Sequence, residues 1–312
     1  MTGELFSGSA KRCAFVTGAT GFVGSNLVRR LVADGWDTHI VVRSDSKLEL
    51  LDDVTNRIII HRHDGTTEDM LDIIGASKPE MVFHLASLFL AQHTFSDIER
   101  LVSSNLLFAT QLIEAMTANG VHLLVNTGTS WQHFENQPYS PVNLYAAMKQ
   151  AFEAILQYYV EACSLRVITL KLFDTYGPND PRPKLLHLLK KIADEGTVLA
   201  MSPGEQLIDL VYIDDVIEAF LLAARRLQTK EVQLHESYAV NSGKPLKLRE
   251  LVKVYSHVTG KDLPIEWGYR PYRQREVMVP WNRDEALLGW SPKIGLEEGI
   301  KKMEHKSGER SK

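Results

Sequence analysis

Tyr145 and Lys149 are the two residues of this chain whose types and spacing best suit proton transfer. They lie four positions apart in a segment with helical periodicity, so both side chains project from one face. A free phenol titrates near pH 10, too high for efficient proton donation at neutral pH, and a neighbouring ammonium group stabilises the phenolate. Thr127, at the end of a predicted strand, is the candidate hydroxyl for holding a substrate oxygen.

A glycine-rich loop lies far upstream of this pair. Gly18, Gly21 and Gly24 follow an apolar β-branched run and open a helical pattern. This arrangement lets the backbone approach a pyrophosphate and aims the N–H groups of a helix N-terminus at it. The strand before the loop and the helix after it favour a dinucleotide site over a tight turn without a ligand.

The residues that end the second predicted strand bear on the choice of dinucleotide. Arg43 and Ser44 stand where a carboxylate would select NAD, and an Arg can pair with a 2′-phosphate. NADPH is therefore favoured, with NAD as the alternative because Asp45 follows at once and Arg43 could be a solvated charge. Asp64, after the third strand, is a candidate partner of an adenine amino group or a turn former.

The elements that must position these residues alternate along the first half of the chain. Strands are expected at 14–17, 38–42, 57–61, 81–85, 121–126 and 166–173, and helices at about 22–32, 106–118 and 145–161. Continuous apolar strands separated by helices predict an α/β fold, a Rossmann-type doubly wound parallel sheet covered on both faces.

A change of pattern follows Tyr176-Gly177-Pro178. We expect a dinucleotide-binding domain over residues 1–174 and a smaller C-terminal substrate-binding lobe over most of 175–312. Segments near 209–220 and 238–241 are expected to return to the first domain, with strands at 210–213 and 238–241. The charged end, from Lys301 onward, is expected to be a solvated tail.

Several motifs resemble the extended branch of the short-chain dehydrogenase/reductase superfamily, which acts on nucleotide sugars. They are TGATGFVG (17–24), VFHLAS (82–87), Asn105 within SNLLFAT, NTGTS (126–130), YAAMK (145–149), LFDTYGP (172–178) and YIDDV (212–216). The resemblance implies a catalytic set of Thr127, Tyr145 and Lys149. The residues expected at the dinucleotide are Gly18, Thr20, Gly21, Phe22, Val23, Gly24, Arg43, Ser44, Asp64, Gly65, Leu85, Ala86, Ser87, Asn105, Tyr145 and Lys149.

Within that superfamily, the stretch GEQLIDLVYIDDVIEAFL and the ending LLGWSP look most like CDP-abequose and CDP-paratose synthases. The resemblance implies NADPH-dependent reduction of a 4-keto-6-deoxy or 3,6-dideoxy hexose linked to a nucleoside diphosphate. An epimerase with tightly held NAD and a non-catalytic dinucleotide-binding scaffold are the alternatives. A dehydratase is disfavoured because Gly128-Thr129 stands where those enzymes resemble Asp-Glu.

The substrate contacts are less sharply indicated by the sequence. Ile208 stands where many relatives carry an Arg for a substrate phosphate, and Arg273 and Arg275 are the candidate replacements because guanidinium groups suit a diphosphate. A solvated basic turn is the alternative for both. Thr129 and Trp131 are candidates for the sugar pocket, or for packing alone.

Composition excludes several classes of protein. The 312 residues carry 35 Lys and Arg against 39 Asp and Glu, a net charge of −4, which argues against a nucleic-acid binder. No apolar run approaches the roughly 20 residues that span a bilayer, so we expect no membrane segment and a cytoplasmic location. The two cysteines, Cys13 and Cys163, indicate small core residues, and no metal-ligand spacing is visible. A homodimer is expected through helices near 101–118 and 145–159.

Overall fold

The computed structural model describes residues 12–229, 234–283 and 285–308, and its largest element is a seven-stranded sheet. The strand order is β11-β6-β5-β4-β1-β2-β3, and every neighbouring pair is parallel. The strands are β1 Cys13–Thr17, β2 Asp37–Arg43, β3 Ile58–His63, β4 Met81–His84, β5 Leu123–Thr129, β6 Arg166–Leu172 and β11 His235–Val240. The predicted doubly wound α/β class is confirmed.

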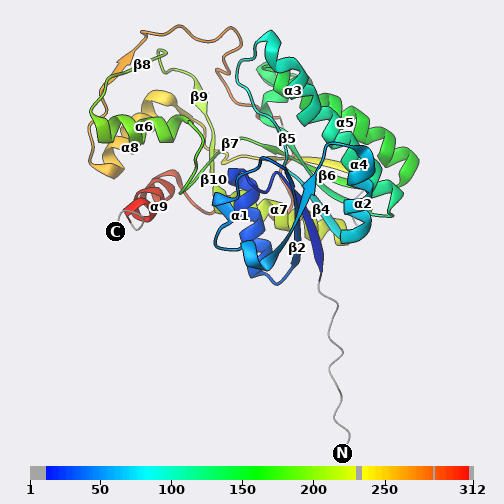
Figure 1. Ribbon diagram of the computed structural model, residues 1–312. Coiled ribbons are helices and arrows are strands. Elements are labelled where there is room, and N and C mark those ends of the chain that lie inside the picture. Colours follow the sequence, from blue (N-terminus) through cyan, green and yellow to red (C-terminus); the bar gives the residue numbers. More distant parts are fainter. Residues whose placement is uncertain (1–11, 230–233, 284, 309–312) are drawn as a thin grey trace, which may run out of the picture.

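Helices cover both faces of this sheet (Figure 1). Helices α1 (Phe22–Ala33) and α7 (Ile213–Gln228) pack on one face, against Ala14 and Val16 of β1. Helices α2 (Thr67–Ser77), α4 (Phe108–Ala118) and α5 (Leu144–Cys163) pack on the other, against Phe15. Successive strand residues point to opposite faces, so neighbouring apolar residues of β1 serve two separate cores.

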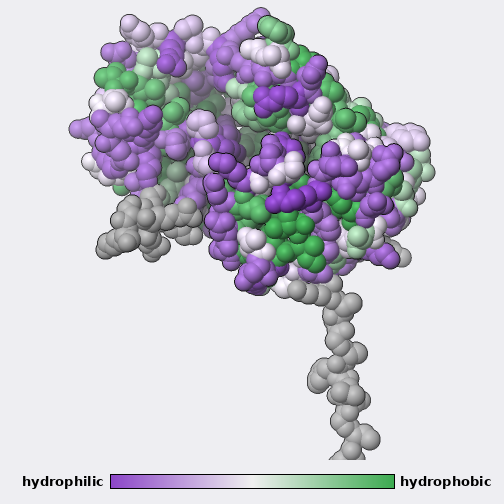
Figure 2. Space-filling model, in the orientation of Figure 1, coloured by the Kyte–Doolittle hydropathy of each residue, from purple (hydrophilic) through white to green (hydrophobic). Residues whose placement is uncertain are grey.

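The second part of the chain gathers beside the sheet, where Figure 1 shows α6, α8 and α9. These helices span Leu185–Glu195, Leu248–Thr259 and Leu296–Gly308. Three two-stranded sheets join them. They are β7 Asp174–Tyr176 with β10 Leu210–Tyr212, β9 Leu207–Ile208 with β12 Leu246–Lys247, and β8 Leu199–Met201 with β13 Ile265–Trp267. Figure 2 shows the surface hollowed between this part and the part that carries the large sheet.

Several elements differ in extent or partner from the sequence predictions. The helix expected at 106–118 begins earlier, because α3 (Ile98–Val102) and a π-helical turn (Ser103–Leu107) lead into α4. Strand β10 pairs with β7 instead of entering the large sheet, whereas β11 does enter it beside β6.

The charged C-terminal end is not a solvated tail over its described part. Helix α9 continues to Gly308, and Met303 packs against the core. The Tyr255 hydroxyl donates to Glu304 at 3.1 Å. These contacts therefore hold α9 against the protein despite the many charged residues of this segment. Within the ranges that the structure describes, no helix is long and apolar enough to cross a membrane.

Candidate active site

The glycine loop joins β1 to α1 and is shaped for a close approach of backbone to ligand. Gly18 has φ +69°, and the Gly21 N–H donates to the Gly18 carbonyl at 3.0 Å. A Cβ at Gly24 would lie 2.8 Å from the Gly18 carbonyl carbon, so a side chain would force the helix away from the loop. No described side chain caps α1 at Gly21. The first N–H groups of α1 are thus free to bind a pyrophosphate, and the loop fits the predicted dinucleotide.

Other predicted cofactor residues follow the carboxyl-terminal ends of neighbouring strands. The glycine loop follows the same end of β1. Arg43 ends β2, is exposed, and donates to Asp45 at 3.1 Å; Ser44 follows it. Asp64 follows β3, and its carboxylate accepts from the Thr66 N–H and hydroxyl, which lowers its pKa. The next residue, Gly65, has φ +101°. The Asp64 carboxylate already shapes the turn into α2, as a turn former would.

Thr17 fixes the loop that follows β4. Its hydroxyl oxygen accepts from the N–H groups of Leu85 and Ala86, both at 3.1 Å. The hydroxyl proton must then go to Nδ1 of His84, 2.9 Å away, which leaves the His84 proton on Nε2. Burial, aided by Lys149, lowers the pKa of His84 to about 3. His84 is therefore a neutral core residue.

Asn105 holds the next part of the same loop from the π-helical turn. Its side-chain oxygen accepts from the Ser87 hydroxyl at 2.6 Å and from the Leu88 N–H at 3.1 Å. Its amide group donates to the carbonyls of Leu88 and Leu101. All four hydrogen-bonding positions of this side chain are used within the protein. Asn105 thus fixes the loop after β4, and its predicted contact with the dinucleotide stays a prediction.

Helix α5 carries Tyr145 and Lys149. Its cap is Asn143, whose side chain accepts from the Ala146 N–H at 3.0 Å and donates to the Leu90 carbonyl at 3.1 Å. This cap ties the first turn of α5 to the loop after β4. Burial raises the pKa of Tyr145 to about 12. Burial also lowers the pKa of Lys149 to about 8, although the carboxylate of Glu153 acts to raise it. Below pH 8 the Lys149 side chain is thus a buried cation four residues from a buried phenol.

Thr127 lies inside β5, which continues to Thr129 rather than ending at Thr127 as the sequence suggested. Strand β5 packs against α5. The Thr127 hydroxyl is buried and has no hydrogen-bond partner among the described residues. A buried polar atom without a partner is uncommon in folded proteins and suggests a ligand group that completes it.

A buried polar network lies beside this site. Lys171 of β6 contacts Glu153 of α5 at 3.6 Å and His133 Nε2 at 2.8 Å. Nε2 of His133 accepts from the Lys171 ammonium while Nδ1 donates to the Gln137 carbonyl, so the ring is neutral; burial and Lys171 lower its pKa. Gln132 donates to Glu153 at 2.9 Å. These contacts fix the segment after β5 to the helix that carries Tyr145 and Lys149.

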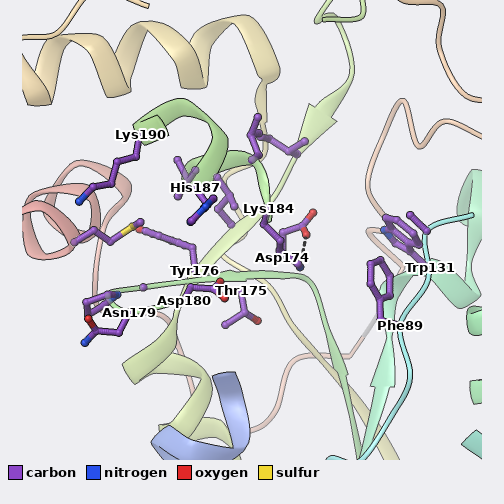
Figure 3. A pocket seen from close by; sticks show the side chains of 18 of the residues that line it. Phe89, Trp131, Asp174, Thr175, Tyr176, Asn179, Asp180, Lys184, His187 and Lys190 are labelled. Atoms are coloured by element: carbon purple, nitrogen blue, oxygen red, sulfur yellow. Dashed lines mark hydrogen bonds and ion pairs between the residues drawn. The ribbon is translucent and has the colours of Figure 1, made fainter. Parts of the chain in front are cut away.

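A cavity of about 460 Å³ opens between the loop after β4 and the segment that leads into α6, and Tyr145 is not among its described lining residues. Figure 3 shows Phe89 and Trp131 on one side of it, with Asp174 and Lys184 opposite. The Phe89 ring meets Tyr145 edge-on at 5.1 Å and lies 5.5 Å from Trp131. Lys184 donates to Asp174 at 3.0 Å. Phe89 therefore contacts both the cavity and the Tyr145 ring.

The predicted substrate residues reach this cavity in part. Trp131 and Arg273 line it, and the Arg273 guanidinium stands 5.5 Å from the Trp131 ring while holding Glu276 at 2.7 Å. Arg275 is not among the described lining residues; it donates to Ser140 at 2.7 Å. The Thr129 hydroxyl caps the short helix after β5 by accepting from the Trp131 N–H, and it does not line the cavity either.

The sequence analysis missed other residues that line the cavity. Lys184 precedes α6 and Lys190 lies on it, and Asp174 and Tyr176 lie on β7. Ile208 also lines it, at the place where an Arg was expected from the resemblance. Lys184, Lys190 and Arg273 bring three cationic side chains to the cavity. Each has a carboxylate partner: Asp174, Glu304 and Glu276 respectively. The motif LFDTYGP (172–178), which contains Asp174 and Tyr176, and the change of pattern after Pro178 were sequence signals for this region.

Comparisons with known proteins agree with this geometry. A model of the NAD dependent epimerase/dehydratase family matches residues 14–238. The chain is 29% identical over 309 residues to a UDP-glucose 4-epimerase of Mycolicibacterium smegmatis, covering 92% of this chain and 96% of that protein. It is 25% identical over 291 residues to a CDP-abequose synthase of Salmonella muenchen, covering 92% and 95%.

The solved structures show the same fold. A UDP-glucose 4-epimerase from Thermotoga maritima, crystallised with UDP-glucose, superposes with a TM-score of 0.83 at 23% identity. The match covers 96% of this chain and 100% of that chain, so it extends over the large sheet and the smaller sheets beside it.

Proposed function

The chain belongs to the NAD dependent epimerase/dehydratase family, and we propose that it reduces the 4-keto group of a nucleoside-diphosphate sugar with NADPH. The proposed sugar is a 4-keto-6-deoxy or 3,6-dideoxy hexose. The observation that carries the proposal is the buried, unpaired Thr127 hydroxyl on β5, which packs against the helix of Tyr145 and Lys149. The membership confirms the resemblance found in the motifs.

Tyr145, Lys149 and Thr127 have different roles in the protonation of the sugar oxygen O4. A bound NADPH would supply hydride to C4, and the Tyr145 hydroxyl donates its proton to O4 of the sugar. The Lys149 ammonium, charged at neutral pH with its pKa near 8, stabilises the resulting phenolate. The Thr127 hydroxyl donates a hydrogen bond to the same sugar oxygen and so opposes the charge that develops there.

The cavity is the proposed place of the nucleotide sugar. Lys184, Lys190 and Arg273 neutralise the diphosphate, and Phe89 and Trp131 pack on the sugar next to Tyr145. Lys184 thereby takes the role that the sequence analysis gave to Arg275. Residues 175–312 supply most of these contacts, consistent with a substrate-binding lobe that begins there.

Arg43 supports NADPH over NAD in this proposal. It ends β2 beside the glycine loop, with its side chain exposed and held only by the equally exposed Asp45. An exposed ion pair contributes about 0–1 kcal/mol, so a 2′-phosphate can displace Asp45 from the guanidinium. Arg43→Ala should raise the Kd of NADPH about tenfold or more and leave that of NADH unchanged, because one charge-assisted contact is lost. Lys47→Ala, at another exposed cation nearby, is the matched control.

The decisive experiment follows turnover. Purified protein is titrated with NADPH and NADH, then incubated with CDP- and dTDP-linked 4-keto-6-deoxyglucose while NADPH absorbance is followed. Consumption of NADPH with one ketone supports the proposal. Tyr145→Phe should lower kcat by about 10²–10⁴-fold with NADPH binding retained. Tyr158→Phe, at an exposed tyrosine of the same helix, should be fully active. An active Tyr145→Phe variant would refute the proposed role.

An epimerase with bound NAD is the second candidate. It is favoured by the 29% identity to the UDP-glucose 4-epimerase of M. smegmatis. Such an enzyme oxidises and re-reduces the same carbon, so it would purify with NAD and convert UDP-glucose without consuming NADPH. Finding bound NAD together with an isomerised sugar would replace the reductase proposal with this one.

We also propose that the chain forms a homodimer through α3, α4 and α5. Phe95, Ile98 and Val102 recur at helical spacing and are exposed, as are Leu107 and Tyr158. Large apolar side chains that are exposed on neighbouring helices typically mark an interface. Light scattering should give a dimer for the intact chain and a monomer for Val102→Glu, whereas a monomeric intact chain would exclude the dimer.

A further inference from the structure

A cluster of potential metal ligands lies at the amino-terminal ends of β1 and β2. The glycine loop follows the opposite, carboxyl-terminal end of β1. Cys13 is the first residue of β1, Asp37 is the first of β2, and His39 is the third. The Cys13 sulfur, an Asp37 carboxylate oxygen and a His39 ring nitrogen all lie within 4.8 Å of one another. The reaction proposed above uses none of the three.

The register of the two strands brings these ligands together. Cys13 pairs with Asp37 across the parallel ladder, so their side chains point to the same face. Asp37 and His39 are two residues apart on β2 and share that face as well. Cys13 lies on β1 and is far in the sequence from Asp37 and His39 on β2. The sequence therefore shows no metal-ligand spacing for this set of residues.

His61 orients the imidazole of this cluster. Nδ1 of His39 lies 2.9 Å from Nε2 of His61, and the two rings stack at 5.2 Å. Nε2 of His39 points the other way, 3.6 Å from Asp37. With the Nδ1 proton donated to His61, the Nε2 lone pair faces the carboxylate and the thiol. Histidines that bind metals are commonly held in this way by a partner on the other ring nitrogen.

The surroundings of Cys13 are negative. The carboxylates of Asp37 and Glu80 lie near the Cys13 thiol. The thiol donates to the Ser77 carbonyl at 3.4 Å, at the C-terminal end of α2, where the helix dipole is also negative. A divalent cation is the group that such a place stabilises. Cys13 itself is half-buried and so remains open to solvent on one side, unlike the core residue expected from the sequence.

We propose that Cys13, Asp37 and His39 form a binding site for a divalent transition metal of the zinc class, with water as the fourth ligand. Thiolate and imidazole ligands select Zn²⁺ and Co²⁺ over Mg²⁺ and Ca²⁺. On binding, the thiol proton passes to solvent and a sulfur–metal bond forms, with no change of oxidation state. The bound ion links the amino-terminal ends of β1 and β2, and the glycine loop follows the other end of β1.

Cobalt titration of the full chain tests this proposal, because thiolate ligation to Co²⁺ produces a near-ultraviolet charge-transfer band. The protein is kept reduced with a phosphine and free of chelators. The band should saturate at one equivalent of Co²⁺ and disappear on addition of Zn²⁺, while excess Mg²⁺ leaves it unchanged. The cluster of His63, Asp64 and Asp69 has no thiol and contributes nothing to this band.

The two cysteines described by the structure provide a matched pair of variants. Cys163→Ser should keep the band, and Cys13→Ser should abolish it. His61→Phe should retain the band but weaken Co²⁺ binding about 10- to 100-fold, the usual effect of removing an outer partner of a metal-bound histidine. If Cys13→Ser does not fold, Asp37→Ala at the half-buried carboxylate is used, and it should also weaken the binding.

Several outcomes would overturn the metal site. They are the absence of a band in the intact chain, a band that survives Cys13→Ser, and a band that is lost in Cys163→Ser. None of these outcomes bears on ketoreduction, so the metal site and the proposed function are tested separately.

Discussion

Replacing Lys149 by Met should make the protein without ligands more stable while it removes activity. Lys149 is 3% exposed, and its charge faces the neutral His84 of β4 and the carboxylate of Glu153, one turn further along α5. Glu153 has a second cationic partner in Lys171. Met fills a similar volume without a charge, and it leaves Glu153 paired.

The size of the gain follows from the pKa of Lys149. Burial lowers that pKa from 10.5 to about 8, which corresponds to about 3 kcal/mol of unfavourable free energy in the folded state. The full cost applies below pH 8, where the lysine is charged in both states. It declines as the pH rises from 8 to 10.5, because the folded state binds fewer protons there than the unfolded state. His84 and Tyr145, with pKa values of about 3 and about 12, do not titrate in this interval.

Urea unfolding of the two proteins at several pH values measures this effect. Lys149→Met should be more stable than the intact protein by about 3 kcal/mol at pH 7 and by about 1 kcal/mol at pH 9.5. Lys191→Met, at an exposed lysine of α6, is the control and should leave the free energy of unfolding unchanged at both pH values. A Lys149→Met variant that is less stable at pH 7, or a difference that does not change with pH, would refute the reasoning.

Three further predictions concern the loop, the hydroxyl and the cavity. Thr127→Val should lower kcat about 10- to 100-fold without loss of stability, because the buried hydroxyl has no described protein partner, and thermal unfolding beside steady-state kinetics checks both parts. Gly24→Ala should weaken dinucleotide binding and lower the melting temperature, since its Cβ would overlap the Gly18 carbonyl; unchanged NADPH affinity in calorimetry would contradict this. Lys184→Met should raise the KM for the nucleotide sugar about tenfold or more with little change in kcat, whereas Lys191→Met, at an exposed lysine outside the cavity, should behave as the intact enzyme.

The fold class and the central chemistry could be predicted because their signals are local. Gly18, Gly21 and Gly24 stand in one loop between a strand and a helix, and the structure keeps that order. Tyr145 and Lys149 share one face of a helix because they are four residues apart. The apolar runs of the strands predict a doubly covered parallel sheet because both of their faces are buried.

Other features of the site depend on contacts between distant segments. The Asn105 side chain is hydrogen-bonded to Ser87, Leu88 and Leu101. Arg275 donates to Ser140 and lies over the Phe134 ring. A side chain with several hydrogen-bonding groups goes to whichever partners the folded chain brings to it, and sequence spacing does not contain those partners.

By itself the sequence determined the strand–loop–helix units, the glycine loop and the helical pair Tyr145 and Lys149, because each depends on backbone preferences and on periodicity within a few residues. Only the tertiary structure decided which side chains meet across elements. It brought Phe89 against Tyr145, placed Lys184 on Asp174, and set Cys13 beside Asp37 and His39. Strand register and packing of distant segments produce these contacts, and both arise only when the whole chain has folded.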